Sequence, residues 1–428
     1  MTLFADILSA VFERRTRRVV SDGVEDGRPL EDMAEALVRA TGETSGLVLA
    51  REILDRYERL EDDEKCAFFA HLAHAMNIDP EAVRTSLDAY ERDASKSSYR
   101  AFAAAAEPPR QEFIRRLNMV PGATGALVKM RSDLLRIGKS DPALQALDLD
   151  FHHLFASWFN RGFLVLRPIS WESPAHILEK IIAYEAVHAI ESWEDLRRRR
   201  EPSDRRCFAF FHPSMPDEPL IFVEVALTRG IPSSVQAVLA EERAQMRASE
   251  ADTAVFYSIS NCQSGLASIS FGNSLIKQVA SDLAAELDGL DTFVTLSPIP
   301  NLIQWLDRSA LTYSVEHGET MRAAAAYYLL NAKAPNGLPF DPVARFHLGN
   351  GAVIHDVHAD ADTSPKGRQQ SGGAMVNYLY DLAQVEQNHE SFVTTHAVPA
   401  TQQVRDLAGP VAPQDNEKGQ ADAKSSLR

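Results

Sequence analysis

The chain has 428 residues, of which 45% are hydrophobic and 24% are charged. This composition is typical of a globular protein with a sizeable core and enough length for two domains. Acidic residues outnumber basic ones by 60 to 44, which gives a net charge of −16 and argues against nucleic acid as a partner, because phosphate binding favours a basic surface.

The N-terminal region, residues 1–160, is predicted to be helical. Asp79, followed by a proline, is a helix start signal, because the aspartate can cap and the proline fits the first helical position. Val83, Leu87 and Tyr90 then recur at helical spacing, and we expect them to form a buried stripe. The region shows no reactive motif, so its expected role is packing between subunits.

Beyond residue 160 short apolar runs alternate with amphipathic helical segments. This alternation indicates an α/β or α+β catalytic domain over residues 161–408. The expected strands are Phe163–Leu166, Phe208–His212, Pro219–Leu227, Ala254–Ser260 and Phe293–Ser297. The tail, residues 409–428, is rich in polar residues and is expected to be disordered.

An arginine-rich stretch, Arg197–Arg200 with Arg205 and Arg206, admits two interpretations. It could form a phosphate-binding patch. Acidic residues such as Glu201 and Asp204 interleave with it, which favours a solvated helix end and connector.

The cellular compartment is predicted from the cysteines and the chain ends. Three cysteines without CxxC spacing indicate a reducing compartment and no disulfide framework. Asp6 and Glu13 weaken a mitochondrial targeting interpretation, and Ser425–Arg428 is not a peroxisomal signal. No apolar run approaches the roughly 20 residues of a membrane-spanning helix, so we predict a cytoplasmic protein without a membrane partner.

A strand–loop–helix unit is the most informative local pattern. Strand 254–260 is expected to run into a loop with Gly265 and Gly272, and a helix is expected from about Ser274. Glycines let a ligand approach the backbone closely, and the unpaired N–H groups at a helix start favour negative charge. The pattern fits a cradle for a pyrophosphate group, or a plain strand–helix connection.

Two further segments hold reactive side chains next to tight turns. Ser297 lies in Leu296–Pro300, at the end of a strand and before a rigid proline turn; alone, such a serine often caps the next helix. His347 lies in Arg345–Ala352, between apolar neighbours and before a glycine-rich turn. It could titrate near neutrality and move a proton, or be a satisfied core histidine.

A third group of residues imitates a metal site. His355, His358, Asp360 and Asp362 have ligand-like spacing, but we expect them in a polar loop without a second cluster to complete the coordination shell. We therefore predict no metal.

These segments together resemble the malonyl-CoA decarboxylase family. The resemblance covers residues 160–408, and its ordered motifs are Phe211–Pro213, Glu218–Leu227, Phe256–Ser260, Gln263–Leu266, Gly272–Lys277, Leu296–Pro300, Arg345–Ala352 and Ala374–Tyr380. It implies an N-terminal helical oligomerisation domain, a tetramer, and a catalytic α/β domain with a GNAT-like acyl-CoA fold.

The resemblance also implies a site. Ser297 and His347 would be the catalytic pair and Tyr378 a supporting hydroxyl. The substrate, malonyl-CoA, would be held through its coenzyme A portion by Ala267, Ser268, Ile269, Ser270, Phe271, Gly272 and Asn273. The animal enzymes carry a glutamate where this chain has Ser270, so a carboxylate at that position cannot orient the histidine here. No cofactor is required, because the thioester itself accepts the electrons.

Loss of CO2 from a malonyl thioester leaves an enolate that must be stabilised and then protonated. We expect His347, with a pKa near 6.5 as in free histidine, to donate the proton, and Ser297 to bind the substrate carboxylate or relay its proton. Two alternatives remain: an N-acyltransferase of the GNAT type, and a catalytically silent coenzyme A-binding regulator.

Overall fold

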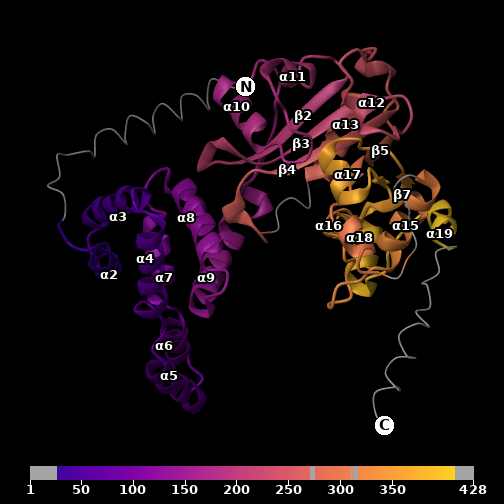
Figure 1. Ribbon diagram of the computed structural model, residues 1–428. Coiled ribbons are helices and arrows are strands. Elements are labelled where there is room, and N and C mark those ends of the chain that lie inside the picture. Colours follow the sequence, from indigo (N-terminus) through magenta and orange to yellow (C-terminus); the bar gives the residue numbers. More distant parts are fainter. Residues whose placement is uncertain (1–26, 270–274, 310, 312–316, 410–428) are drawn as a thin grey trace, which may run out of the picture. The chain divides into compact units, whose positions relative to one another are not determined.

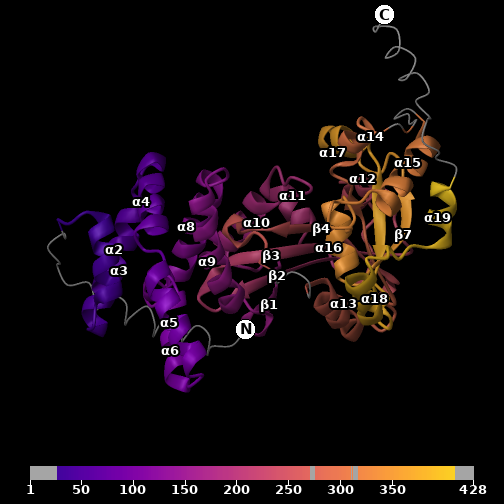
Figure 2. The same ribbon diagram turned by 90° about the horizontal axis from the view of Figure 1, so that it is seen from below.

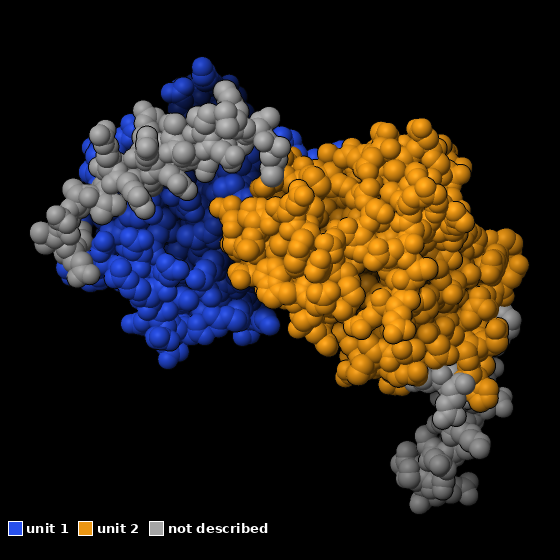
Figure 3. Space-filling model, turned by 90° about the horizontal axis from the view of Figure 1, so that it is seen from above, with its two compact units in different colours: residues 1–163, 212–216, 263–269 blue, residues 164–211, 217–262, 270–428 orange. Residues whose placement is uncertain are grey.

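The computed structural model describes residues 27–269, 275–309, 311 and 317–409. The chain forms two compact units (Figure 3). Unit 1 comprises residues 1–163, 212–216 and 263–269, and unit 2 comprises residues 164–211, 217–262 and 270–428. The tail predicted to be disordered, residues 409–428, lies outside the described residues except for Gly409.

Unit 1 is helical, as the sequence predicts. Its helices are α2 (Leu30–Arg39), α3 (Glu43–Glu58), α4 (Asp62–His74), α5 (Pro80–Arg92), α6 (Lys96–Ala106), α7 (Pro109–Leu117), α8 (Ala123–Ile137) and α9 (Pro142–Trp158), followed by the 3-10 turn η1 (Arg161–Phe163). The start signal at Asp79 is confirmed, because its side chain accepts hydrogen bonds from the N–H groups of Glu81 and Ala82. Leu127, Met130 and Leu134 of α8 are buried.

Helices α5 and α6 form a hairpin that packs mainly on itself and projects from the other helices of unit 1 (Figure 1). The expected buried stripe on α5 is wrong: no residue of these two fully described helices is buried, and Leu87 is 38% exposed. Tyr90 instead packs on Tyr99 and Phe102 of α6, with ring centroids 5.9 and 6.5 Å apart. The apolar face follows helical spacing, but among the described helices of unit 1 no third helix packs substantially on this hairpin.

Unit 2 is an α/β domain. Its strands are β1 (Val165–Pro168), β2 (Arg205–His212), β3 (Met215–Thr228), β4 (Thr253–Asn261), β5 (Thr292–Thr295), β6 (Ser297–Pro298), β7 (Val353–His358) and β8 (Met375–Leu379). Its helices are α10 (Ala175–Tyr184), α11 (Trp193–Arg198), α12 (Val235–Leu239), α13 (Leu275–Glu286), α14 (Leu302–Leu306), α15 (Gly318–Asn331), α16 (Pro342–Gly349), α17 (Pro365–Ser371), α18 (Val385–Thr395) and α19 (Gln402–Ala408). The predicted class, a helical region followed by an α/β domain, is confirmed.

Within the described residues the strands form one mixed sheet of eight strands in the order β1-β2-β3-β4-β5-β8-β6, with β7 on β8. Strands β4 and β5 are parallel, whereas β8 is antiparallel to β5, β6 and β7. Helices α10 and α11 bury an apolar stripe, including Ile177, Ile181 and Leu196, against β2 and β3 (Figure 1 and Figure 2). This core lies against β2 and β3, whereas the candidate active site lies at β5, β6 and β8 of the same sheet.

The arginine stretch is only partly solvated. Arg197 is exposed and pairs with Glu201, as the sequence predicts for a helix end. Arg199, Arg200 and Arg205 are buried, so the expectation of a solvated stretch is wrong for them. A carboxylate on β3 makes this possible: Glu224 is fully buried and pairs with Arg200, which keeps the buried guanidinium ionised.

Candidate active site

Ser297 begins β6, directly after the break that ends β5. Strand β8 bridges this break by pairing with β5 at Val294 and with β6 at Ser297. Between these points the side chain of Thr295 takes part: its Oγ1 accepts hydrogen bonds from the N–H of Tyr378 at 3.2 Å and from the Ser297 hydroxyl at 2.8 Å. The strand predicted to end at Ser297 ends at Thr295 instead, and Ser297 begins the short strand β6, where Thr295 accepts a hydrogen bond from its hydroxyl.

His347 lies in the last turn of α16. The helix is capped by Asp341, a buried aspartate directly before it, whose carboxylate accepts a hydrogen bond from the N–H of Ala344 at 2.8 Å. Burial raises the pKa of Asp341 to about 6. The cap and the proline at the first helical position fix the register that directs His347 inward, where it is 2% exposed.

Ser297 and His347 meet. The distance between Ser297 Oγ and His347 Nε2 is 3.1 Å, although the residues are 50 positions apart. The Ser297 hydroxyl proton is donated to Thr295, so Oγ accepts from Nε2–H of the imidazole. In the free protein His347 therefore does not act as a base that activates Ser297 as a nucleophile. The Ser297 hydroxyl keeps its proton and can donate it in a hydrogen bond to a ligand.

A tyrosine that the sequence analysis overlooked completes the arrangement. The hydroxyl of Tyr380 lies 2.8 Å from His347 Nδ1, the second ring nitrogen. A neutral imidazole that carries its proton on Nε2 accepts at Nδ1, so Tyr380 donates. Tyr380 thus donates to His347, His347 donates to Ser297, and Ser297 donates to Thr295, whose hydroxyl oxygen accepts.

Tyr378, the tyrosine that the sequence analysis selected, contacts the histidine differently. Its ring stacks on the imidazole of His347, with centroids 4.5 Å apart and planes 22° from parallel. Its hydroxyl is buried and has no hydrogen-bond partner among the described residues. Burial raises the pKa of Tyr378 well above its usual value, which keeps this hydroxyl protonated as a donor.

The expectation that His347 titrates near neutrality is wrong for the free protein. Burial disfavours the imidazolium and lowers the pKa of His347 to about 3. The sequence shows apolar neighbours, but the burial of His347 also involves contacts with Ser297 of β6 and with Tyr378 and Tyr380 at the end of β8. A proton donor in this position needs a negative charge nearby to become protonated.

The proposed coenzyme A segment is described only in part. Ala267, Ser268 and Ile269 follow the 3-10 turn η3 (Ser264–Leu266) and belong to unit 1. Ser270, Phe271, Gly272 and Asn273 lie outside the described residues, as does Ser274. The predicted strand before the loop and helix after it are confirmed as β4 and α13.

The four residues with metal-like spacing are not grouped around one point. His355 and His358 lie in β7 rather than in the expected polar loop, and the side chain of His358 bonds Asn377 of β8. Among the described residues no cluster of three or more histidine, cysteine or acidic side chains could hold a metal ion.

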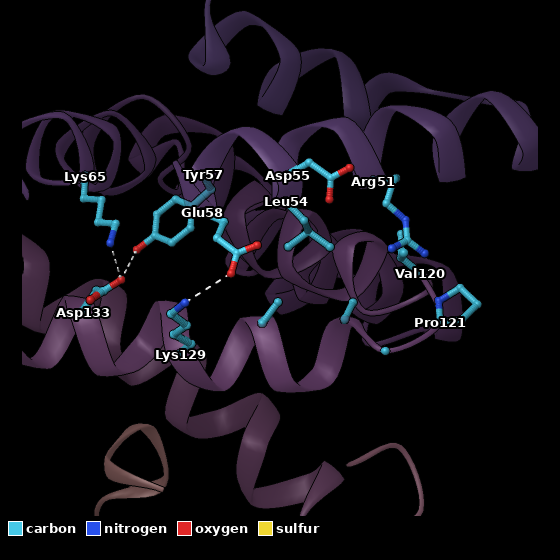
Figure 4. Close-up of a pocket in the computed structure, with 13 residues that line it drawn as sticks. Arg51, Leu54, Asp55, Tyr57, Glu58, Lys65, Val120, Pro121, Lys129 and Asp133 are labelled. Carbon is cyan, nitrogen blue, oxygen red and sulfur yellow. Dashed lines mark hydrogen bonds and ion pairs between the residues drawn. The ribbon is translucent and has the colours of Figure 1, made fainter. Parts of the chain in front are cut away.

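A separate cavity of about 250 Å³ lies in unit 1 between α3, α4 and α8 (Figure 4). Four of its charged residues form ion pairs: Lys65, together with the Tyr57 hydroxyl, contacts Asp133, and Lys129 pairs with Glu58. This internal pairing is typical of helix packing rather than of a site prepared for a charged ligand.

A buried chain of hydroxyl, imidazole and phenol inside an α/β domain is an arrangement typical of enzymes that use general acid–base catalysis. Comparison with known families then identifies the protein more closely. The model for the malonyl-CoA decarboxylase C-terminal domain matches residues 162–317 and 313–420, and the model for the N-terminal domain of the same family matches residues 76–159. The chain belongs to the malonyl-CoA decarboxylase family, which consists of carboxy-lyases, and the resemblance inferred from the motifs is confirmed.

Individual relatives agree with the family assignment. The mitochondrial malonyl-CoA decarboxylase of Anser anser anser is 32% identical over 349 residues, which cover 69% of each chain. The crystal structure of malonyl-CoA decarboxylase from Rhodopseudomonas palustris is 48% identical with a TM-score of 0.84 and covers 88% of this chain and 98% of that one. The Agrobacterium vitis structure is 47% identical with the same TM-score and covers 89% and 99%.

Proposed function

We propose that the protein decarboxylates malonyl-CoA to acetyl-CoA and CO2, with His347 as proton donor and Ser297 as the group that binds the substrate carboxylate. The observation that carries the proposal is the 3.1 Å contact between the two side chains in a buried setting. A buried site suits this reaction, because a low-dielectric environment favours release of a charged carboxylate as neutral CO2.

The proton balance of the reaction fits a histidine that is neutral when free. Malonyl-CoA brings a carboxylate, whose negative charge raises the low pKa of free His347, so that the ring takes up one proton from solvent as the substrate binds. The bond between C2 and C3 then breaks, its electron pair moves into the thioester as an enolate, and CO2 departs. The imidazolium delivers its proton to C2, which yields acetyl-CoA and restores neutral His347.

The two tyrosines would have different roles. A phenol both donates and accepts, so Tyr380 can donate to Nδ1 of the neutral ring and accept from Nδ1–H of the imidazolium. Tyr378 has a buried, unengaged hydroxyl beside the imidazole and would donate to the enolate oxygen. Such preorganised donors are typically worth about 10² to 10³ in rate.

Coenzyme A would be held by the segment Ala267–Asn273. Glycine-containing loops that lead into a helix suit a pyrophosphate, and the segment precedes α13. Ser270 replaces the glutamate of the animal enzymes, and the Tyr380–His347 hydrogen bond supplies orientation of the ring without a carboxylate.

The direct test is CO2 release from malonyl-CoA by the purified protein without any amine acceptor, in the presence of a chelator. We expect stoichiometric CO2 and acetyl-CoA. Turnover that requires an added amine would favour the N-acyltransferase alternative, and coenzyme A binding without turnover would favour the silent regulator.

We further propose that the protein is a cytoplasmic homo-oligomer, a tetramer by family resemblance. Support for association comes from the α5–α6 hairpin, whose apolar face includes Leu87 at 38% and Tyr99 at 59% exposure. Support for the compartment comes from three free cysteines. None of the described helices is long and apolar enough to span a membrane.

A further inference from the structure

Arg131 is a buried cation of α8 that contacts the loop after β4. Its residue is 1% exposed, and its Nη1 donates to the carbonyl oxygens of Gly265 at 2.8 Å and Ala267 at 3.0 Å. Its Nε and Nη2 donate to the carboxylate of Asp148 on α9 at 2.7 and 3.4 Å. One guanidinium therefore joins two helices of unit 1 to the loop.

Two further side chains of unit 1 contact the same loop. The hydroxyls of Ser132 and Ser264 lie 2.7 Å apart. His152 Nε2 donates to the carbonyl oxygen of Ser268 at 3.3 Å. Ser268 has a φ of 67°, a left-handed conformation that a non-glycine residue keeps only when its surroundings hold it there.

Gly265 shows how closely the loop approaches the helix. A Cβ at this position would lie 1.8 Å from the carbonyl oxygen of Val128 in α8, so only glycine allows the contact. The backbone of the loop thus lies directly against the backbone of α8, and the hydrogen bonds from Arg131 stabilise this contact.

The buried charge of Arg131 makes it unfavourable for the loop to move away from α8. A buried guanidinium is costly unless its donors find acceptors, and Asp148 accepts only part of them. The carbonyl groups of Gly265 and Ala267 accept hydrogen bonds from Nη1. If the loop moved away, Arg131 would lose two charge-assisted hydrogen bonds in a buried environment.

We infer that Arg131 is a positioning residue for substrate binding: it fixes the backbone of Ser264–Ser268 before coenzyme A arrives. This inference rests on the proposed function, which assigns the segment from Ala267 to the coenzyme A portion. A loop that is already ordered binds more tightly than one that must be ordered on binding. The helical unit would then contribute to substrate affinity as well as to association between subunits.

Arg131→Lys tests the inference, because lysine keeps the charge beside Asp148 but lacks the fork that reaches two carbonyl groups as well. We expect KM for malonyl-CoA and Kd for coenzyme A to rise about tenfold, with kcat within about twofold of the original. For malonyl-pantetheine, which lacks the pyrophosphate, KM should rise by less than about threefold. Equal effects on both substrates, or a fall in kcat alone, would overturn the inference.

Arg110→Lys is the matched control. Arg110 is likewise buried in unit 1, pairs with Asp150 and donates to the carbonyl oxygen of Ala73, all within helices. We expect its KM for malonyl-CoA to stay within about twofold, because the coenzyme A loop is not touched. A rise as large as that of Arg131→Lys would mean that any weakened helix pairing has this effect, which would refute a specific role.

Two further measurements make the result decisive. If Arg131→Lys fails to fold, Ser132→Ala removes the milder contact with Ser264, and Kd for coenzyme A should rise about threefold; an unchanged Kd would overturn the inference. Calorimetric binding of coenzyme A needs no turnover. A wild-type protein that binds coenzyme A but releases no CO2 would therefore refute the proposed function alone, while a raised Kd in Arg131→Lys would still support the inference.

Discussion

The hydroxyl of Tyr380 lies 2.8 Å from Nδ1 of His347, on the side of the ring opposite the nitrogen that faces Ser297. This hydrogen bond sets the tautomer, because a donor at Nδ1 leaves the ring proton on Nε2. The orientation of the proposed proton donor therefore depends on a phenol rather than on a carboxylate. Each variant below tests one part of this arrangement or of its surroundings.

Tyr380→Phe should lower kcat about tenfold to a hundredfold, because the ring loses the partner that fixes its tautomer and orientation. KM should change little, since Tyr380 is buried behind the histidine. Steady-state kinetics with malonyl-CoA measures both constants. A kcat equal to that of the unmodified protein would remove Tyr380 from the mechanism.

Tyr378→Phe keeps the stacking on His347 and removes only the unengaged hydroxyl. We expect kcat to fall about a hundredfold if that hydroxyl stabilises the enolate. The unfolding midpoint should hold or rise, because the hydroxyl has no partner among the described residues. A large loss of stability with unchanged kcat would contradict the proposed role.

His347→Asn should reduce kcat by about 10² to 10⁴, the usual contribution of a general acid, while Kd for coenzyme A stays within about twofold. Calorimetry with coenzyme A and a CO2 release assay separate the two effects. Parallel loss of binding and turnover would indicate a histidine that only supports the fold.

Ser297→Ala should lower kcat about 10² to 10³, because the substrate carboxylate loses its donor. Thr295→Val is the matched comparison: it removes the acceptor that orients Ser297 but keeps the serine. We expect a smaller loss, about tenfold. A larger loss for Thr295→Val than for Ser297→Ala would show that Thr295 acts mainly through the strand break.

His347 should make the protein sensitive to acid. Its folded-state pKa is lowered to about 3, so between about pH 6.5 and pH 3 the unfolded chain binds a proton that the native state does not. Stability is therefore lost as the pH falls through this window. From pH 6.5 to pH 5 the loss attributable to His347 should approach about 2 kcal/mol in the free energy of unfolding.

Denaturant titration of the wild-type protein and His347→Asn at both pH values measures this difference. Burial raises the pKa of Asp341 to about 6, so protonation of Asp341 stabilises the native state as the pH falls, which is the opposite effect. Asp341 is present in both proteins, so its contribution to the pH dependence cancels in the comparison. Identical pH dependence of the two proteins would mean that the imidazole is more solvated than its burial implies.

Leu87→Asp combined with Tyr99→Asp should weaken self-association, because it charges the apolar face of the α5–α6 hairpin. Light scattering should show a smaller species, with kcat per chain nearly unchanged. Val393→Asp, at a 54% exposed position of α18, is the control and should leave the mass unchanged. A wild-type protein that is already monomeric would refute the proposed association.

Local signals predicted much of the fold correctly. The capping aspartate at Asp79 and the β-rich run that became β4 need only their neighbours in sequence. The burial of α5 was mispredicted, because helical spacing shows which face is apolar but not whether the chain provides a partner for it. The buried Arg200 was missed for a related reason: Glu224, its partner, comes from a strand 24 positions away.

The sequence predicted residues of the candidate site, but it did not predict the contacts that these residues make. Motif resemblance selected Ser297 and His347, and the structure brings them together. Alternation along a strand puts Tyr378 and Tyr380 on one side, so sequence alone offered both tyrosines equally. Their different roles, and the low pKa of His347, follow from packing that no local pattern contains.

The close contact between Gly265 and α8 has a consequence for the design of fragments of this protein. A fragment starting at residue 164 would retain Ser297 and His347 but lose the helices on which residues 263–269 lie. The two family models meet near residue 160. We expect that cutting the chain at this border would not give two parts that fold and bind substrate independently. Exchange of helical regions between relatives should succeed only when the loop after β4 travels with its helices.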